Sequence, residues 1–403
     1  MQLEEFRYVT TPVYQTGATL NAIAAELPFT GVSFSQQLNS VGTFQGHVLL
    51  SGLNSEYLNV YDGTVPGQYI LWVLYTDPYG VTTPIWSGVI WSREYDSANQ
   101  TLSISAQEMM SLYNRRLIST TQDYSDNPSD PLGYDPAYIA YELMAYAEGL
   151  THGNTGLTQN LATTGYRTKK LYEGYQLKSV YQAIKDLSSQ FFDFAIKPYL
   201  DASGNLYNQF TIGTNTSTPN PPAPEGGWLG RIYDPTDLTT IVFQFPGNLV
   251  SYNFPEDASS AANKLYGLGY GNNDSKIIAI AIDPTKIGAS GTWPLLEATT
   301  NFTDIGDLQL LQDLTLGQLN AISYPPTTIQ IVIPTYIDPV LTQYQIGDQV
   351  RLDIKDDYFP NGISFGADDD ALRIVGITVN PGENGPARAT LTLTRQAATG
   401  TVS

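Results

Sequence analysis

The amino-acid sequence predicts a β-rich α+β protein made of several domains. Its 403 residues exceed the roughly 100 to 200 residues of an ordinary domain. Hydrophobic residues make up 42% of the chain, which is enough to build several cores and excludes a disordered protein. The 35 glycines, 25 prolines and 28 tyrosines suit a chain with many strands and many turns.

Residues 1–118 are predicted to form a small antiparallel barrel or sandwich. Short extended segments follow one another, and the turns DPYG and DSANQ separate the longest of them. A short helix at 108–117 closes this region, with Met109, Leu112 and Tyr113 facing inward. The expected strands lie at 32–38, 43–52, 69–76, 81–95 and 101–107.

Residues 119–238 are predicted to form an α+β domain. Asp135 and Pro136 suit the N-cap and the first position of a helix. A second helix at 176–191 precedes a clear hairpin, and the Pro-rich segment 214–227 is expected to be a loop or linker. The apolar positions that define the two helices are Ile139, Leu143, Tyr146 and Leu150, then Val180, Ile184 and Leu187.

The chain returns to strands after residue 238. The segment 277–282, IIAIAI, is apolar on both faces, so we expect it to be buried on both sides or to lie at an interface. A helix at 304–322 follows, with Asp307 as its cap, although Gly317 weakens its later turns. Leu308, Leu311, Leu314 and Leu319 are expected on one side of this helix. Further strands are expected within 239–254, 263–272, 327–334, 344–354, 371–379 and 387–396.

Two hairpins far apart in the sequence follow the same pattern. Residues 86–107 and 372–396 each contain two strands of alternating apolar residues joined by a turn. Each hairpin follows a strand that a glycine opens, Gly67 in the first case and Gly347 in the second. Any β protein contains look-alike hairpins, but three matched strands in the same order favour a duplicated β-domain.

The charge and the missing cysteines exclude several classes of function. The net charge is −20 with only 19 Lys and Arg, so no basic stripe exists to hold nucleic acid, and anionic lipids would repel the chain. An acidic surface would also repel passing DNA, or it simply aids solubility. Without cysteine there is no disulfide, thiolate catalysis or Cys-ligated zinc. The N-terminal segment has no apolar signal core, and no apolar run is long enough to cross a membrane.

Candidate catalytic residues are few, and each has a simpler structural reading. His47 lies in an expected strand and His152 in a polar loop, without the motif context of a triad or a zinc site. Three acidic runs could supply an acid and a base for glycoside cleavage, but adjacent loop residues do not predict two carboxylates facing across a cleft. The run at 368–370 also lacks the spaced pattern of a calcium loop. The acidic runs are Glu4–Glu5, Asp356–Asp357 and Asp368–Asp370.

The glycines and tyrosines are also read as structural. GLGYGNND at 267–274 is followed by a strand pattern rather than a helix, which excludes a phosphate loop. We expect these glycines to allow tight bends or close packing between subunits. The many tyrosines suit protein interfaces or stacking on sugars, and the interface is the favoured reading. The sequence therefore predicts no enzyme, with no catalytic, cofactor-binding or metal-binding residues.

The order of these segments resembles the phage tail hub family. That family includes the baseplate hub of contractile phages, the N-terminal part of siphophage tail-associated lysins and minor tail proteins of actinobacteriophages. The resemblance implies two similar β-barrels, at 1–118 and at 239–275 with 326–403, an α+β domain at 119–238, and a small inserted domain at 276–325. The stretches that carry it are SGVIWSREYDSANQTLSISAQEMMSLYNRRL, SVYQAIKDLSSQFFDFAI, AANKLYGLGYGN and YQIGDQVRLDI with the two strands after it.

The resemblance also implies an assembly. Members form a homotrimer whose two barrels per chain give a ring of near-sixfold symmetry. We expect such a ring at the tail tip of a virion, assembled in the host cytoplasm, joining the tail tube, tape measure and distal tail protein to tip or fibre proteins. DNA would pass through its channel without specific binding. The alternatives are a distal tail ring component, a cell-wall hydrolase or a host-glycan-binding tail protein. Members that cut cell wall carry long C-terminal extensions, so we do not expect lysis here.

Overall fold

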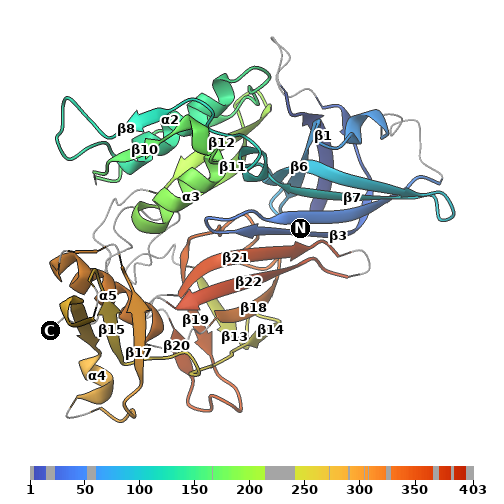
Figure 1. Ribbon diagram of the computed structural model, residues 1–403. Coiled ribbons are helices and arrows are strands. Elements are labelled where there is room, and N and C mark those ends of the chain that lie inside the picture. The colour runs from blue at the N-terminus through green and yellow to red at the C-terminus, as the bar shows by residue number, and fades with distance from the viewer. Residues whose placement is uncertain are drawn as a thin grey trace.

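The structure is a computed structural model, and four bodies can be followed in it (Figure 1). The predicted loop 214–227, the cap Asp307 and the acidic run Asp368–Asp370 lie outside the described residues. Within the described part of the chain, no helix has the length and apolar character to cross a membrane. The structure describes residues 4–14, 23–51, 60–165, 167–213, 241–271, 273–288, 291–303, 305–306, 308–323, 328–365, 372–382 and 385–395.

Two units of strands form the centre of the molecule. Their inward faces follow the alternation of the sequence, since every second residue of β7 and β18 is a buried apolar side chain. The first unit contains β1 (Glu5–Pro12), β2 (Ala25–Glu26), β3 (Phe29–Gln37), β4 (Thr43–Leu49), β5 (Tyr69–Thr76), β6 (Thr82–Asp96) and β7 (Thr101–Glu108). The second contains β13 (Val242–Phe245), β14 (Ser251–Asn253), β18 (Thr328–Pro334), β19 (Gln349–Ile354), β20 (Ile363–Phe365), β21 (Leu372–Asn380) and β22 (Arg388–Arg395).

The two units repeat one order of strand pairing. The first runs β1–β5–β6–β7–β4–β3, and the second runs β13–β19–β21–β22–β18–β14. When β2 and β20 are left aside, strands with the same place in the sheet also have the same place in the chain order of their unit. One difference is the direction of the first pair, because β1 is antiparallel to β5 whereas β13 is parallel to β19.

The register of the two predicted hairpins is also the same. In β6 a bulge at Trp91 is followed by five residue pairs before the turn, and in β21 a bulge at Val375 is followed by five. Three more pairs lie on the other side of each bulge. Gly67 and Gly347 both have positive φ, 76° and 93°. Their N–H groups donate to the carbonyls of matching isoleucines, at 2.7 and 2.8 Å. The duplicated hairpin is therefore present, and its glycines have equal roles.

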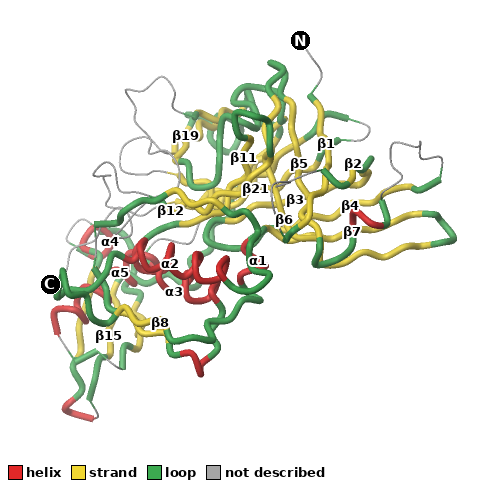
Figure 2. The backbone as a smooth tube through the Cα atoms, turned by 90° about the horizontal axis from the view of Figure 1, so that it is seen from above, coloured by secondary structure: helices red, strands yellow, loops and turns green. Residues whose placement is uncertain are grey.

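Strand β21 joins the units to each other. Leu372 and Arg373 pair with β19, whereas residues 376–379 pair with β3 of the first unit, and β3 lies beside β21 both in Figure 1 and in the view from above in Figure 2. Between these two sets the Val375 carbonyl accepts the Leu38 N–H at 3.0 Å. One hydrophobic core continues through both units as a result. The β-rich multidomain class is confirmed, while the described pairings leave each unit open between its first and last strands.

The α+β body confirms the predicted helices and hairpin. Asp135 caps the first helix by accepting the Ala137 N–H at 2.8 Å, and Pro136 is its first residue. The stripe of Val180, Ile184 and Leu187 is fully buried in the second helix. The elements are α1 (Met110–Tyr113), β8 (Gln122–Tyr124), α2 (Pro136–Gly149), β9 (Thr158–Asn160), β10 (Lys170–Tyr172), α3 (Val180–Phe191), β11 (Phe194–Leu200) and β12 (Leu206–Ile212).

A small sheet with one long helix forms the fourth body. It contains β15 (Lys264–Leu268), β16 (Ile278–Ile282), α4 (Pro284–Ile287), β17 (Glu297–Asn301) and α5 (Leu308–Ile322), in the strand order β16–β15–β17. Because β15 pairs with β16 and β17, this body includes residues before the proposed boundary at 276. The domain boundaries themselves stay a prediction.

For the strand at 278–282 one of the two expected alternatives is excluded, and for α5 the expected row of leucines was wrong. The strand at 278–282 is not buried on both sides, since α5 covers Ala279 and Ala281 while Ile278 and Ile280 are 50% and 38% exposed. An interface on that open face stays a prediction. In α5 the leucines do not all share the buried side: Leu311 and Leu319 face the sheet, but Leu308 and Leu314 are exposed. The residues of α5 that are buried against the sheet follow one another at intervals of four, namely Leu311, Thr315 and Leu319.

Candidate functional site: the junction of the α+β body with the strand units

The α+β body rests on the first unit through an apolar contact. Val89 of β6 packs in one buried cluster with Leu206 of β12, and Ile196 of β11 packs against the same cluster. Beside them the Ser87 hydroxyl donates to the Asn208 side-chain oxygen at 2.5 Å in a buried position. Burial of such side chains contributes about 1.5 to 3 kcal/mol each, so this side of the body is held firmly.

The contact of the α+β body with the second strand unit is polar. Asp193, directly before β11, forms an ion pair with Arg373 of β21, and their side chains are only 6% and 8% exposed. Asn39, in the turn between β3 and β4, donates to the Asp193 carboxylate at 2.7 Å and accepts the Phe194 N–H at 2.8 Å. Arg373 also donates to the Gly347 carbonyl at 3.0 Å. All three large bodies therefore meet at one buried carboxylate.

The repeated register explains why the two contacts differ. Val89 and Arg373 stand at the same place in their hairpins, one residue before the isoleucine that precedes each bulge. Both residues face the α+β body, one through an apolar cluster and the other through an ion pair. The two equivalent positions, Val89 and Arg373, therefore differ in chemistry, and the α+β body has one apolar and one charged contact with the strand units.

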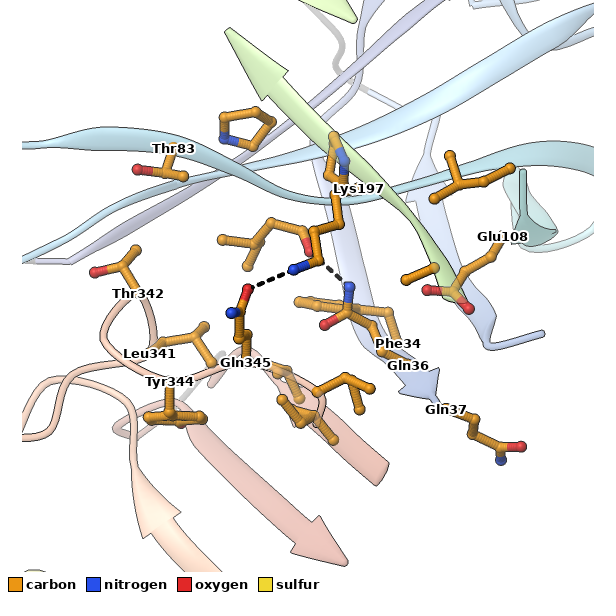
Figure 3. A pocket seen from close by; sticks show the side chains of 18 of the residues that line it. Phe34, Gln36, Gln37, Thr83, Glu108, Lys197, Leu341, Thr342, Tyr344 and Gln345 are labelled. Atoms are coloured by element: carbon orange, nitrogen blue, oxygen red, sulfur yellow. Dashed lines mark hydrogen bonds between the residues drawn. The ribbon is translucent and has the colours of Figure 1, made fainter. Parts of the chain in front are cut away.

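A cavity of about 220 Å³ lies beside this junction (Figure 3). Lys197 of β11 reaches across it and donates to the Gln345 side-chain oxygen at 2.9 Å. Burial lowers the pKa of the Lys197 ammonium, and the nearby charge of Asp348 opposes that shift. The lysine therefore forms a second polar link between the α+β body and the second unit.

Glu108 lines the same cavity from the end of β7. Its carboxylate accepts the Gly42 N–H at 2.6 Å. Burial raises the pKa of the Glu108 carboxyl to about 8, and the bond from Gly42 opposes this only in part. The cavity thus holds a carboxyl group that is mainly protonated near neutral pH. These groups hold three bodies in place, and none is paired with a nucleophile in the manner of a catalytic dyad.

The two histidines and the described acidic residues named from the sequence, Glu4, Glu5, Asp356 and Asp357, do not meet at this junction. His47 lies on β4, where its Nδ1 is 3.0 Å from the Ser103 hydroxyl. His152 lies in a turn with a positive φ of 60°, and its ring packs on Tyr14. Asp356 accepts the Tyr252 hydroxyl and the N–H groups of its own turn. Glu4 accepts from the hydroxyls of Tyr75 and Thr335, at 3.1 and 2.6 Å. These contacts fit the structural reading of each residue, which stays a prediction.

The glycines at 267–271 serve packing within the chain. A Cβ on Gly267 would lie 1.9 Å from the Thr315 hydroxyl of α5, and one on Gly269 would lie 2.8 Å from Leu311. Gly271 has a positive φ of 115°. The bend that we expected is present, but the close contacts are with α5 of the same chain, and close packing between subunits stays a prediction.

The residues of the junction were missed in the sequence. Asn39 stands in a turn and Asp193 in the short connection from α3 to β11, where Asn and Asp are common for local reasons. Arg373 offered the one usable signal, because it is a charged residue inside the apolar strand pattern LRIVGITV. A buried charge requires a partner, but the sequence does not show which one.

Solved structures share this fold over nearly the whole chain. A tail protein from Neisseria meningitidis MC58 aligns with a TM-score of 0.54 at 14% identity, covering 96% of each chain. The 43 kDa tail protein of prophage MuSo2 from Shewanella oneidensis gives 0.58 at 12% identity, covering 98% of this chain and 100% of that one. A Francisella PdpA–VgrG complex gives 0.57 at 10% identity, covering 98% of this chain and 53% of that one. At such identities the likeness shows a shared fold. No protein-family model matches the chain, and no curated protein matches its sequence.

Proposed function

We propose that the chain is a structural component of a phage tail, and specifically a tail hub. Three copies would form a ring at the tail tip of the virion. The ring would join the tail tube, the tape measure and the distal tail protein to tip or fibre proteins. The shared fold with two tail proteins, one of them from a prophage, along almost their whole length supports a place in a tail, and we propose no catalytic role.

The repeated strand units carry this proposal. A chain with two units of the same strand order and the same hairpin register would present two related surfaces. Three such chains around a threefold axis then present six similar surfaces in a ring. One polypeptide can in this way contact a sixfold ring on one side and a threefold structure on the other.

The charge of the chain agrees with a ring that surrounds DNA. A net charge of −20 disfavours contact with phosphates, so DNA would pass the channel without being held.

The open face of β16, with Ile278 and Ile280 exposed, supplies apolar surface that a second copy would cover. We propose that such a ring is assembled in the host cytoplasm and then becomes part of the virion.

Light scattering of the purified full chain tests the oligomer. We expect the mass of a trimer, and we expect Ile280→Lys to lower the trimer fraction while the exposed control Tyr358→Lys leaves it unchanged. A hexamer would instead favour the distal tail ring. A chain that remains a monomer at high concentration, and is also missing from the reconstructed tail tip, would overturn both.

Cell-wall turnover tests the catalytic alternative. We expect the purified chain to release no soluble fragments from peptidoglycan. Turnover that disappears when one named carboxylate is changed would replace the structural proposal with an enzymatic one. Binding to host glycans without turnover would favour the glycan-binding alternative.

A further inference from the structure

A groove of about 890 Å³ opens between the starts of β1 and β3. Aromatic side chains line its floor, among them Phe6, Tyr8 and Phe29, and the last two pack edge to face at 5.3 Å. The turn between β21 and β22 forms one wall. We call this space the β1–β3 groove. It lies at the place where the first unit is left open by its strand pairing.

Two strand edges border the groove with no strand beside them in the described residues. β2 pairs with β1 only at Val9 and Thr10, so the segment from Glu5 to Arg7 has no strand paired with it on that side, although the Arg7 side chain binds Glu26. β21 pairs with β3 only from Phe34 onward, which leaves Phe29 and Thr30 without a strand on that side, and the Phe29 N–H donates to the Leu27 carbonyl at 3.0 Å. A strand edge offers main-chain donors and acceptors to an extended segment. The groove therefore has the features of a site for an added strand.

The wall of the groove is a difference between the two repeated hairpins. Their registers agree, but four residues (97–100) connect β6 to β7 whereas seven (381–387) connect β21 to β22. The longer turn lines the groove through Pro381, Gly382, Gly385, Pro386 and Ala387. Because the shorter turn closes the same hairpin in the first unit, the hairpin itself does not require these additional residues.

The floor suits alternate apolar side chains. Tyr8 and Val32 are almost fully buried, so they form a firm base, while Phe6 and Phe29 are only partly covered. An extended segment points every second side chain to the same face. Several apolar side chains of one strand could therefore enter the groove while the others stay in water.

The mouth of the groove is acidic. Glu4 and Glu5 line it, and Glu5 is exposed to solvent. A second copy of this chain would bring its own net charge of −20 to this mouth. A partner with a basic residue at the matching place would gain a favourable contact instead. The charge therefore favours a different protein over a second copy.

We propose that the β1–β3 groove binds an extended segment of a partner protein by strand addition. The segment is apolar at alternate residues and carries Lys or Arg where it reaches Glu5. This inference goes beyond the proposed hub function and stands whether or not the chain forms a ring. It assigns the longer β21–β22 turn a role in partner binding.

Peptide binding to the full chain tests the inference. The probe is a fluorescein-labelled octapeptide of alternating valine and lysine, measured by anisotropy at physiological salt. One control peptide has the same composition in blocks, and another has the alternating sequence with its amides methylated on one edge. We expect the alternating peptide to bind, and both controls to bind at least about tenfold more weakly, because only the first can add a strand.

Two variants place the peptide in the groove. Gly385 has open space around its Cβ position, so Gly385→Trp fills the groove, with Gly306→Trp as a control of equal size at another open glycine. Glu5→Lys removes the acidic contact, with Glu256→Lys as a control of equal charge. We expect about tenfold weaker binding for Gly385→Trp and about fivefold for Glu5→Lys, with no change in either control. Glu5→Lys remains decisive if Gly385→Trp fails to fold.

Four outcomes would overturn the inference. Equal binding of the block peptide would mean attraction by charge alone. Binding unchanged in both groove variants would place the peptide elsewhere. Tighter binding after deletion of residues 1–3 would identify the start of the chain itself as the occupant. Self-association of the chain that Gly385→Trp abolishes would identify a second copy.

Discussion

Replacing Arg373 by methionine should loosen the α+β body from the second strand unit. The change keeps a long side chain but removes the charge that faces Asp193, and both side chains are almost completely buried. Loss of one partner of a buried ion pair costs about 3 to 5 kcal/mol, because the remaining charge is left without compensation. Asn39 still donates to Asp193, so we expect a cost of about 3 kcal/mol, near the lower end.

A matched control is the pair between Lys178 and Asp186. Both side chains are substantially exposed, so Lys178→Met should cost at most about 1 kcal/mol. A second comparison is the double variant Arg373→Met with Asp193→Leu. It removes both charges, and we expect it to recover most of the lost stability, because an apolar pair has no desolvation cost.

Amide hydrogen exchange with urea unfolding gives the measurement. A protein of four bodies need not unfold in one step, so a single midpoint does not locate the loss. The amides of Phe194 and Gly213 report on the junction, since they donate to Asn39 and to the Asp193 carbonyl. Both should exchange faster in Arg373→Met, while amides in the centre of α2 stay protected. If Arg373→Met behaves like Lys178→Met, the ion pair does not hold the junction and the reasoning is refuted.

Three further changes test other parts of the argument. Burial raises the pKa of Glu108 to about 8, above its usual 4.5, so the folded chain holds a proton that the unfolded chain has lost. The stability of the unaltered chain should therefore fall as pH rises from about 4.5 to about 8. The melting temperature of Glu108→Gln should not show this fall. If both melting temperatures fell equally over this range, the raised pKa of Glu108 would be contradicted. Asp135→Ala removes the N-cap of α2 and should cost about 1 to 2 kcal/mol in urea unfolding, and a smaller loss would mean that other contacts hold the helix start. Gly267→Ala on β15 should cost about 1 to 3 kcal/mol in urea unfolding, because its Cβ would clash with Thr315 of α5. The control Gly317→Ala, in open space on α5, should stabilise the chain by about 0.5 to 1 kcal/mol. Equal effects of the two changes would refute the packing argument.

Local patterns were sufficient for most elements of the fold. The cap at Asp135 and the apolar stripe of α3 follow from spacing along one segment, and the structure places both as expected. The hairpin from β11 to β12 and the strands of both repeated hairpins were found in the same way. Strand β1 was missed, because EFRYVTTP shows no clear alternation, and its later residues are buried on both faces, Tyr8 in one hydrophobic cluster and Val9 in another.

Patterns within one segment could not decide which faces would be covered. Ile278 and Ile280 are as apolar as a core strand requires, yet the single helix α5 covers only the other face of their sheet. The leucines of α5 fit two different rows on a helix, and the close approach of Gly267 to Thr315 decides between them. Such choices depend on which element packs beside which.

The sequence by itself determined the strand-rich class, the repeated hairpins and the glycines that open them, because alternation and turn chemistry are properties of neighbouring residues. Only the tertiary structure showed that the two units share one strand order and one core, and that Asn39, Asp193 and Arg373 meet at one buried junction. These three residues lie far apart along the chain. The ion pair between Asp193 and Arg373 becomes favourable only after packing has removed the surrounding water. The β1–β3 groove depends on tertiary structure for the same reason, since its walls come from the first and the last strands of the fold.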